Sequence, residues 1–315
     1  MLCITNNTNN PYFNIAAEEY LLRNFSDDIF MLYRNTPSII VGKHQNTFAE
    51  LNYWFVKEHN IDVVRRLSGG GTVFHDAGNL NFTFIRNGEE GNLVDFRRFT
   101  QPILDVLHQL GVPAEHSGRN DLIINGLKFS GNAEHVYKKR ILHHGTLLFS
   151  SQLGDLREAL KVNPEQYLHR GVQSVRSKVT NISEHLPAPI AIDTFQDKII
   201  NYIVSQNTDC RDYFFSEADN QLIQQLVNEK YSTWDWNFGY SPRFVFSNKG
   251  IVENKPIEVE LEIEKGKILR AALKIDGNDI PGISDFFSGT VYREESVERI
   301  IRGLGLPASA LRLFF

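Results

Sequence analysis

Short apolar runs fill the first half of the chain, and their spacing limits the fold more than any other feature. We expect strands at 38–41, 61–66, 72–75 and 80–84. In the last of these, Leu80, Phe82 and Phe84 alternate with Asn81 and Thr83. Alternation with a period of two predicts a strand with one buried face. The first half therefore favours a β-sheet.

A tight hairpin and at least two helices are also predicted. Asn125-Gly126 tolerates the positive φ of a hairpin turn between strands at 121–124 and 127–130. After Pro102, one helical face carries Ile103, Val106, Leu107 and Leu110, and Gly111 ends that helix. A second helix is expected around Leu222, Ile223, Leu226 and Val227.

The residue pattern of the sequence changes at 234–239. Beyond it, four apolar residues alternate with four glutamates, and a last helix is predicted from Val297, Ile300, Ile301 and Leu304. The apolar residues of the alternating strand are Ile257, Val259, Leu261 and Ile263. The fold class is therefore α+β: a mixed sheet with helices over 1–236, and a small α+β domain over 245–315.

Composition excludes several classes of protein. The 315 residues carry a formal net charge of -5 and no long basic block, which argues against nucleic acid as a partner. No apolar run approaches the roughly 20 residues that span a bilayer, and the N-terminus lacks a signal-peptide pattern. We therefore expect a cytoplasmic protein without membrane association. Cys3 and Cys210 stand in unrelated contexts, so neither a disulfide scaffold nor a cysteine-rich zinc site is expected.

The strongest local signal is a glycine triplet between two predicted strands. Three glycines let the backbone approach a ligand closely and leave N–H groups to meet an anion. Arg66 adds a planar charge suited to phosphate or carboxylate. The alternative is a flexible hairpin loop, which the flanking arginines, Ser68 and His75 make less favoured.

The predicted hairpin places one lysine among apolar neighbours. In a regular strand Leu127 and Phe129 face one side, and Lys128 and Ser130 face the other. Asn120 and Asp121 could converge on Lys128, whose mobile charge suits a carboxylate becoming a phosphoanhydride. A solvent-facing lysine on an edge strand is the alternative.

His143 and His144 are adjacent, so on a strand they point to opposite faces. A shared metal is therefore disfavoured, and packed or hydrogen-bonded histidines are expected instead. Gly126 to Gly131 has the glycine spacing of a P-loop, but Asn132 stands where the lysine is required.

Together these segments resemble the lipoate–protein ligase family. The segments that carry the resemblance are 14–19, 42–46, 65–76, 118–121, 128–131, 143–146, 171–181 and 234–239. The resemblance implies a catalytic domain similar to biotin ligases and class II aminoacyl-tRNA synthetases, with lipoate and ATP bound within 1–236 and an accessory domain at 245–315.

The resemblance also implies two half-reactions. Lipoate and Mg-ATP give lipoyl-AMP, which then acylates a lysine on an E2 lipoyl domain of a 2-oxoacid dehydrogenase or on the glycine-cleavage H protein. Lys128 is the implied catalytic residue, because it would touch both the lipoate carboxyl and the α-phosphate. The implied ligand-binding residues are Arg66, Ser68, Gly69, Gly70, Gly71, Thr72, Val73, Phe74, His75, Asn120, Asp121, Lys128, His144, Val179 and Thr180. The metal ligands stay unassigned.

Other readings remain open. A lipoyl or octanoyl transferase of the same fold would lack the adenylation step. The thioester-forming type needs a cysteine at the site, whereas Cys3 precedes the predicted fold and Cys210 is far in sequence from every motif. A biotin ligase has a different order of arginine and glycine in its loop, and a non-catalytic lipoate-binding protein would not need both Arg66 and Lys128.

Overall fold

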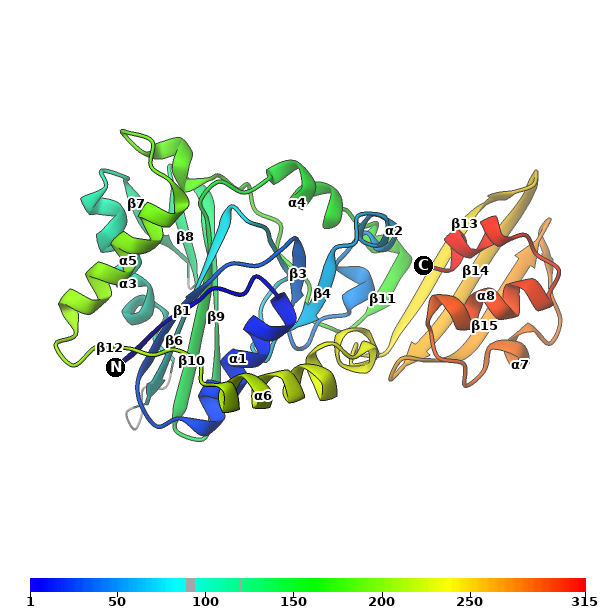
Figure 1. Ribbon diagram of the computed structural model, residues 1–315. Coiled ribbons are helices and arrows are strands. Elements are labelled where there is room, and N and C mark those ends of the chain that lie inside the picture. Colours follow the sequence, from blue (N-terminus) through cyan, green and yellow to red (C-terminus); the bar gives the residue numbers. More distant parts are fainter. Residues whose placement is uncertain (89–93, 119) are drawn as a thin grey trace. The chain divides into compact units, whose positions relative to one another are not determined.

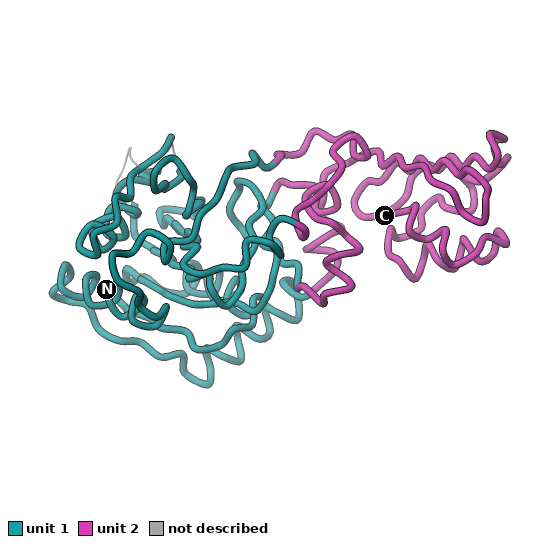
Figure 2. The backbone as a smooth tube through the Cα atoms, turned by 90° about the horizontal axis from the view of Figure 1, so that it is seen from above, with its two compact units in different colours: residues 1–43, 62–157, 174–232 teal, residues 44–61, 158–173, 233–315 magenta. Residues whose placement is uncertain are grey.

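The computed structural model describes residues 1–88, 94–118 and 120–315 and divides into two compact units (Figure 2). The first unit comprises Met1–Lys43, Asp62–Arg157 and Ser174–Ser232. The second comprises His44–Ile61, Glu158–Gln173 and Thr233–Phe315. The short helix α4 (Leu153–Ala159) contains the change of unit at Arg157.

A mixed eight-stranded sheet forms the centre of the first unit, in the order β12-β1-β2-β6-β10-β9-β8-β7 (Figure 1). Its strands are β1 (Leu2–Asn6), β2 (Ile29–Tyr33), β6 (Asn79–Asn87), β7 (Ala114–Ser117), β8 (Asp121–Ile124), β9 (Leu127–Tyr137), β10 (Arg140–Leu148) and β12 (Arg211–Asp212). β1 pairs in parallel with β2 and β12, and the other pairs are antiparallel. The expected mixed-sheet architecture is confirmed.

A smaller sheet carries the glycine triplet. Its order is β4 (Asp62–Arg65), β3 (Ser38–Val41) and β5 (Val73–His75), with β3 parallel to β4 and antiparallel to β5. The strands predicted at 38–41, 61–66 and 72–75 are therefore present, and the triplet lies in the connection from β4 to β5.

Helices cover both faces of the large sheet (Figure 1). On one face lie α3 (Phe96–Gln109) and α5 (Ile192–Gln206), over the main apolar core. On the other lie α1 (Pro11–Asn24) and α6 (Glu217–Leu226), and α1 contacts β6 and β10. Among the described residues, no helix combines the length and the apolar character needed to cross a bilayer.

β6 is buried on both faces, so the prediction of one exposed face was wrong. Leu80, Phe82 and Phe84 belong to the core under α3 and α5. Asn81 and Thr83 point the other way and are no more than 1% exposed, because α1 covers that face. Polar side chains are tolerated on this buried face because they form hydrogen bonds there. Thr83, for example, donates to a glutamate of α1.

α3 begins at Phe96, so a start after Pro102 was wrong. Asp95 caps the helix by accepting a hydrogen bond from the Arg98 N–H, which fixes its beginning before the proline. Pro102 lies inside the helix, where it removes one backbone donor. The predicted end is confirmed, because Gly111 takes a φ of 77° directly after the last turn.

α6 begins at Glu217, and the N-cap Ser216 forms a capping box with Asp219. Ile223 and Val227 are buried as expected, but Leu222 is 51% exposed and does not belong to the packed face. The helix continues as a π-helix at Val227–Tyr231, which also contacts α1.

The second unit is built on a five-stranded sheet in the order β11-β13-β14-β15-β16. Its elements are α2 (Tyr53–Glu58), β11 (Tyr167–His169), β13 (Phe244–Val252), β14 (Lys255–Glu264), β15 (Lys267–Ile275), β16 (Asn278–Asp279), α7 (Ile283–Phe287) and α8 (Glu294–Gly303). The alternation in β14 is confirmed, since Ile257, Val259, Leu261 and Ile263 are at most 2% exposed. In α8, Val297 and Ile301 are fully buried.

Two early segments of the chain join this second unit. Phe48 is 2% exposed and packs in an aromatic cluster with Phe244, Tyr292 and Phe315. β11 pairs with β13 and so covers an edge of the sheet. The last segment of the second unit begins at Thr233. His44–Ile61 and Glu158–Gln173 belong to the same unit, although the expected range 1–236 contains them.

The two cysteines are neighbours, so their predicted unrelated contexts were wrong. Cys3 lies within β1 rather than before the fold, and Cys210 directly precedes β12, the strand that pairs with β1. Their thiols are in hydrogen-bonding contact, and both are free. Burial, together with Cys210, raises the pKa of Cys3 to about 12.

Truncating Phe48 should destabilise the second unit. We expect Phe48→Ala to lower the free energy of unfolding by about 3–5 kcal/mol, because it leaves a cavity inside the aromatic cluster. Denaturant unfolding measures this change. Phe286→Ala is the control, since Phe286 is 62% exposed and its loss should stay within about 0.5 kcal/mol. Equal effects of the two substitutions would contradict this account of the 44–61 segment.

Candidate functional site

The glycine loop between β4 and β5 is organised around Arg66. Its guanidinium is buried and donates to the Gly69 carbonyl at 2.6 Å, the Gly71 carbonyl at 2.7 Å and the Ile40 carbonyl at 2.9 Å. Gly70 has a φ of 86°, and a Cβ there would lie 3.1 Å from Arg66 Nη2. With two carbonyls turned onto the arginine, the loop is shaped before any ligand arrives.

Arg65 also binds backbone carbonyls of the protein. It is fully buried and donates to the carbonyls of Gly42 at 3.0 Å and Lys43 at 3.1 Å. Both arginines of the motif therefore hold backbone carbonyls. The expected contact of Arg66 with a nucleotide stays a prediction.

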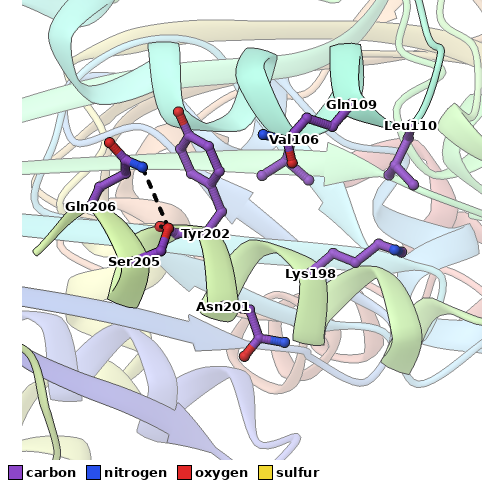
Figure 3. A pocket seen from close by; sticks show the side chains of 8 residues that line it. All are labelled: Val106, Gln109, Leu110, Lys198, Asn201, Tyr202, Ser205 and Gln206. Atoms are coloured by element: carbon purple, nitrogen blue, oxygen red, sulfur yellow. Dashed lines mark hydrogen bonds between the residues drawn. The ribbon is translucent and has the colours of Figure 1, made fainter.

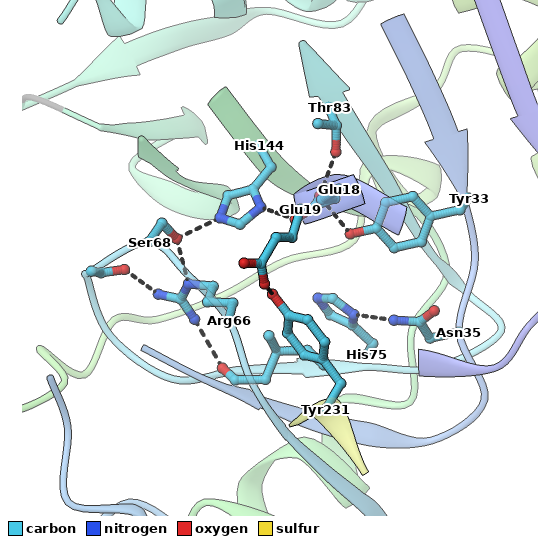
Figure 4. Close-up of polar contacts among 12 residues, drawn as sticks. Glu18, Glu19, Tyr33, Asn35, Arg66, Ser68, His75, Thr83, His144 and Tyr231 are labelled. Carbon is cyan, nitrogen blue, oxygen red and sulfur yellow. Dashed lines mark hydrogen bonds and ion pairs between the residues drawn. The ribbon is translucent and has the colours of Figure 1, made fainter. Parts of the chain in front are cut away.

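A chain of hydrogen bonds runs from Arg66 to α1 (Figure 4). Arg66 Nε donates to Ser68 Oγ at 2.9 Å, and Ser68 Oγ lies 2.6 Å from His144 Nε2. His144 Nδ1 lies 2.7 Å from Glu18 Oε2. Tyr33 and Thr83 donate to the other oxygen of this carboxylate. All of these side chains are at least nine-tenths buried, so their bonds form in a low-dielectric interior.

Glu19, the next residue of α1, has a separate set of partners. It accepts from Tyr231 at 2.6 Å, Lys230 at 2.6 Å and Arg23 at 2.7 Å. Burial raises the pKa of the Glu19 carboxyl, but the bonds from Lys230 and Tyr231 outweigh it and the net shift is downward. Glu19 is therefore held as a carboxylate.

His75, at the end of β5, carries a buried donor. Asn35 donates to His75 Nδ1 at 2.9 Å, which assigns the ring proton to Nε2. Nε2 has no hydrogen-bond partner among the described residues. Burial, then Arg66 and His144, lowers the pKa of His75 to about 3. The ring is therefore neutral, with one N–H for a ligand to accept.

Lys128 reaches the site because of a β-bulge in β9. Leu122 pairs with Ser130 while the next residue, Ile123, pairs with Lys128, so Phe129 is the extra residue. The simple alternation expected for 127–130 was therefore wrong. Gly131 lies beside the lysine amine, because a Cβ at this glycine would be only 3.1 Å from Lys128 Nζ. The bulge thus turns Lys128 to the face that Gly131 shares with Ala133.

That face of β9 is also the one that meets the glycine loop. A Cβ on Gly70 would lie 3.8 Å from the Cβ of Ala133, and Ala133 pairs with His144. Lys128 forms an ion pair with Asp121 at 2.9 Å, and both side chains are about one-quarter exposed. The hairpin and the loop are therefore brought together. The reading of Lys128 as a plain solvent-facing residue is disfavoured.

Other predicted residues support this arrangement through the backbone. The Asn120 amide and the Asn132 amide each donate to the other's carbonyl at 3.0 Å. Phe74 is buried, and Val73 is half-buried, so β5 would offer its backbone rather than its side chains. Arg119, part of the same motif, lies outside the described residues.

The segment from Gly171 to Asn181 borders the loop and the hairpin. Ser174 Oγ accepts from the Thr72 N–H at 2.8 Å, and a Cβ on Gly71 would come within 3.0 Å of that hydroxyl. Lys128 donates its N–H to the Lys178 carbonyl, and Thr180 donates to the Lys128 carbonyl. Between these contacts Val175 is 89% exposed, so the segment is not a packed strand.

The adjacent histidines are hydrogen-bonded, as expected, and lie on opposite faces of β10. His143 is fully buried between Phe82 and Phe99 and contacts Glu134 at 2.9 Å. Burial lowers the pKa of His143 well below its usual range. Across the described residues, no group of three potential metal-binding side chains is assembled.

Several residues of the site were not predicted. They are Glu18, Tyr33, Asn35 and Thr83. One signal was present: Glu18 and Glu19 interrupt an otherwise apolar stretch of helix, where buried charges need partners.

A hollow of about 500 Å³ lies between α3 and α5 (Figure 3). Val106, Lys198 and Tyr202 are among its lining residues. It is on the α3–α5 face of the sheet, whereas His144 and the loop are on the α1 face. It therefore takes no part in the site described above.

Residues 10–204 match the family model of the lipoyl protein ligase A/B catalytic domain. Lipoate–protein ligase 1 of Staphylococcus aureus is 41% identical, covering 94% of this chain and 92% of its own. Lipoate-protein ligase LplJ of Bacillus subtilis is 40% identical, covering 97% and 95%.

Solved structures agree with this similarity. LipL1 of P. falciparum in complex with lipoate has a TM-score of 0.65 at 25% identity, covering 99% of this chain and 97% of its own. A lipoate-protein ligase A bound with ATP has a TM-score of 0.65 at 26% identity, covering 76% and 98%. On sequence and fold alike, the chain belongs to the lipoate–protein ligase family.

Proposed function

We infer that this chain is an ATP-dependent lipoate–protein ligase. It activates lipoate to lipoyl-AMP with release of pyrophosphate and then transfers the lipoyl group to a lysine of a carrier protein. Relatives of this name cover almost the whole chain, and related ligases have been crystallised with lipoate and with ATP.

One observation carries the assignment of the site. The bulge in β9 turns Lys128 onto the face that meets the glycine loop. A mobile cation and a preformed loop of backbone N–H groups thereby lie on the same face of β9, and we infer a ligand space beside them. We propose that Lys128 is the catalytic residue and that this space holds the nucleotide phosphates and the lipoate carboxylate.

The chemistry of the first step fits these groups. The carboxylate of lipoate attacks the α-phosphorus of ATP, a new P–O bond forms, and pyrophosphate leaves. Two anions must approach, so positive charge and N–H donors at the point of attack lower the barrier. Lys128 supplies the charge, while the loop amides and the free His75 Nε2–H supply donors. Asp121 pairs with the Lys128 amine and holds it in place until substrate replaces or shares the contact.

The second step needs no nucleophile from the enzyme. The acceptor lysine attacks the acyl carbon of lipoyl-AMP, and AMP leaves. The anhydride must be kept from water until then, and we propose that the 171–181 segment covers it. Val179 and Thr180 would contact the adenylate, since they flank the backbone of Lys128.

We propose Mg²⁺ as the cofactor of the first step. Mg²⁺ is commonly held by one or two carboxylates together with substrate phosphates. Asp121 offers one carboxylate beside Lys128, and the described residues contain no preassembled three-ligand group, which fits a cation that arrives with the nucleotide. When bound, it would neutralise phosphate charge.

We propose E2 lipoyl domains and the glycine-cleavage H protein as acceptors, and the cytoplasm as the location. A Thermoplasma acidophilum ligase described with its E2 lipoyl domain, 26% identical to this chain, supports the first of these. We further propose that 1–236 carries the catalytic site and 245–315 is accessory. A transferase without adenylation is not favoured, because a similar ligase binds ATP.

Removing the lysine amine should abolish adenylation. We expect Lys128→Ala to reduce ATP–pyrophosphate exchange in the presence of lipoate by about 10²-fold or more, because a preorganised charge is lost. Lys161→Ala is the control, since that amine is exposed and its partner is Glu158, three residues away. Exchange near wild type in Lys128→Ala would place the amine outside the reaction.

Cysteine chemistry should be dispensable. Cys3 belongs to the core under α3 and α5, on the opposite face of the sheet from His144. We expect the Cys3→Ala/Cys210→Ser variant to lipoylate a carrier within a few-fold of wild type, followed by mass spectrometry of the carrier. A folded but inactive variant, or an acyl-cysteine adduct on the wild-type enzyme, would revive the thioester transferase.

The 171–181 segment should become protected when the adenylate forms. Trypsin should cleave quickly after Arg176 or Lys178 in the free enzyme, because both residues are exposed and outside any helix or strand. Lipoate with ATP should suppress these cuts and leave cleavage at Lys138 and Lys139, in the β9–β10 turn, unchanged. Ser174→Ala should speed cleavage of the free enzyme by removing the Thr72 contact. Equal protection with and without substrates would mean that the segment is ordinary scaffold.

A further inference from the structure

Two consecutive glutamates of α1 are buried to the same degree but serve different networks. Glu18 is 2% exposed and Glu19 is 3% exposed, and each carboxylate accepts three hydrogen bonds. The partners of Glu19 lie on α1 and on the π-helix after α6. Among the hydrogen bonds drawn in Figure 4, those of Glu18 continue through His144 and Ser68 to the glycine loop.

The hydrogen bonds between Arg66 and Glu18 form a series in which the donor and the acceptor of each bond can be assigned. Arg66 Nε–H can only donate, so Ser68 Oγ accepts from it. A carboxylate can only accept, so one oxygen of Glu18 receives Thr83 and Tyr33 and the other receives His144 Nδ1–H. His144 Nε2 then carries no proton and accepts a hydrogen bond from the Ser68 hydroxyl. Every donor in the chain has an acceptor, and the chain ends on a negative charge.

The shape of the glycine loop depends on Glu18, the residue at which this chain of hydrogen bonds ends. The same guanidinium that bonds Ser68 also holds the carbonyls of Gly69 and Gly71. A guanidinium is planar, so fixing Nε fixes the direction of its Nη atoms. The tilt of Arg66 therefore sets where the two carbonyls, and hence the intervening N–H groups, point.

We propose that Glu18 is a positioning residue for the adenylation reaction: through His144 and Ser68 it orients Arg66 and so holds the glycine loop in its ligand-binding shape. In this role Glu18 acts through His144 and Ser68. The inference rests on the proposed function for its kinetic consequence, but its effect on the loop exists in the free protein.

Replacing Glu18 by glutamine should disturb the chain at Ser68. If the amide oxygen accepts from Tyr33 and Thr83, the amide nitrogen faces His144 Nδ1 as a donor. The histidine proton then moves to Nε2 and points at Ser68, which already accepts from Arg66. The serine proton loses its buried acceptor, and an unsatisfied buried donor is costly.

The first experiment compares Glu18→Gln with Glu19→Gln, which is the matched control. The KM for ATP in pyrophosphate exchange should rise about tenfold or more in Glu18→Gln, with a smaller change in kcat. Glu19→Gln should lose similar thermal stability but keep the wild-type KM. Equal kinetic changes in the two variants would mean that Glu18 acts only on stability and would overturn the proposal.

A measurement without substrate separates this inference from the proposed function. Hydrogen–deuterium exchange of the amides at 69–72 should be at least several-fold faster in Glu18→Gln than in Glu19→Gln or wild type. No difference at these amides would overturn the positioning role even if the wild-type enzyme is an active ligase. Faster exchange combined with an inactive wild-type protein would refute the ligase function and leave the positioning intact.

A second variant covers the case in which Glu18→Gln does not fold. Ser68→Ala breaks the same chain with a small, uncharged change at a fully buried position. It should reproduce the faster amide exchange at 69–72, and adding Glu18→Gln should increase the exchange little further, because both act through one chain. Unchanged exchange in Ser68→Ala, or fully additive effects, would contradict the proposal.

Discussion

The buried guanidinium of Arg66 is the interaction on which the site depends. It is bonded to the carbonyls of Ile40, Gly69 and Gly71 at 2.6–2.9 Å, so the loop between β4 and β5 is folded back onto a fixed charge. A loop of three glycines would otherwise have large conformational freedom, which ligand binding would have to remove. Preorganising the loop during folding leaves more of the binding energy for the reaction itself.

A second constraint comes from the sheet. In a regular strand Lys128 and Gly131 would lie on opposite faces, because side chains alternate. The extra residue Phe129 breaks that alternation and fills the core, where it is fully buried. One insertion therefore satisfies two needs: an aromatic anchor on the α3–α5 face and a cation on the face that carries the loop and His144.

Individual residues show which structural features could be predicted from the sequence and which could not. The strand at 38–41, the Asn125-Gly126 turn and the alternation in β14 were predictable because local periodicity and turn chemistry decide them. The start of α3 was missed because the Asp95 cap outweighs the proline. Glu18 had no assigned role because its partners, Thr83 and His144, are 65 and 126 residues away. The contact between Cys3 and Cys210 is missed for the same reason.

The sequence by itself determined the α+β class, the glycine loop, the hairpin with its lysine and, by resemblance, the ligase family. These depend on short-range pattern and on motifs in order. Tertiary structure alone decided that Arg66 binds the loop's own carbonyls, that Lys128 turns to the loop, and that His44–Ile61 joins the second unit. Arg66 meets carbonyls three and five residues away, but it is held there by Ile40, 26 residues away. The other two follow from contacts between more distant segments, and one residue of register in β9 is enough to change the outcome.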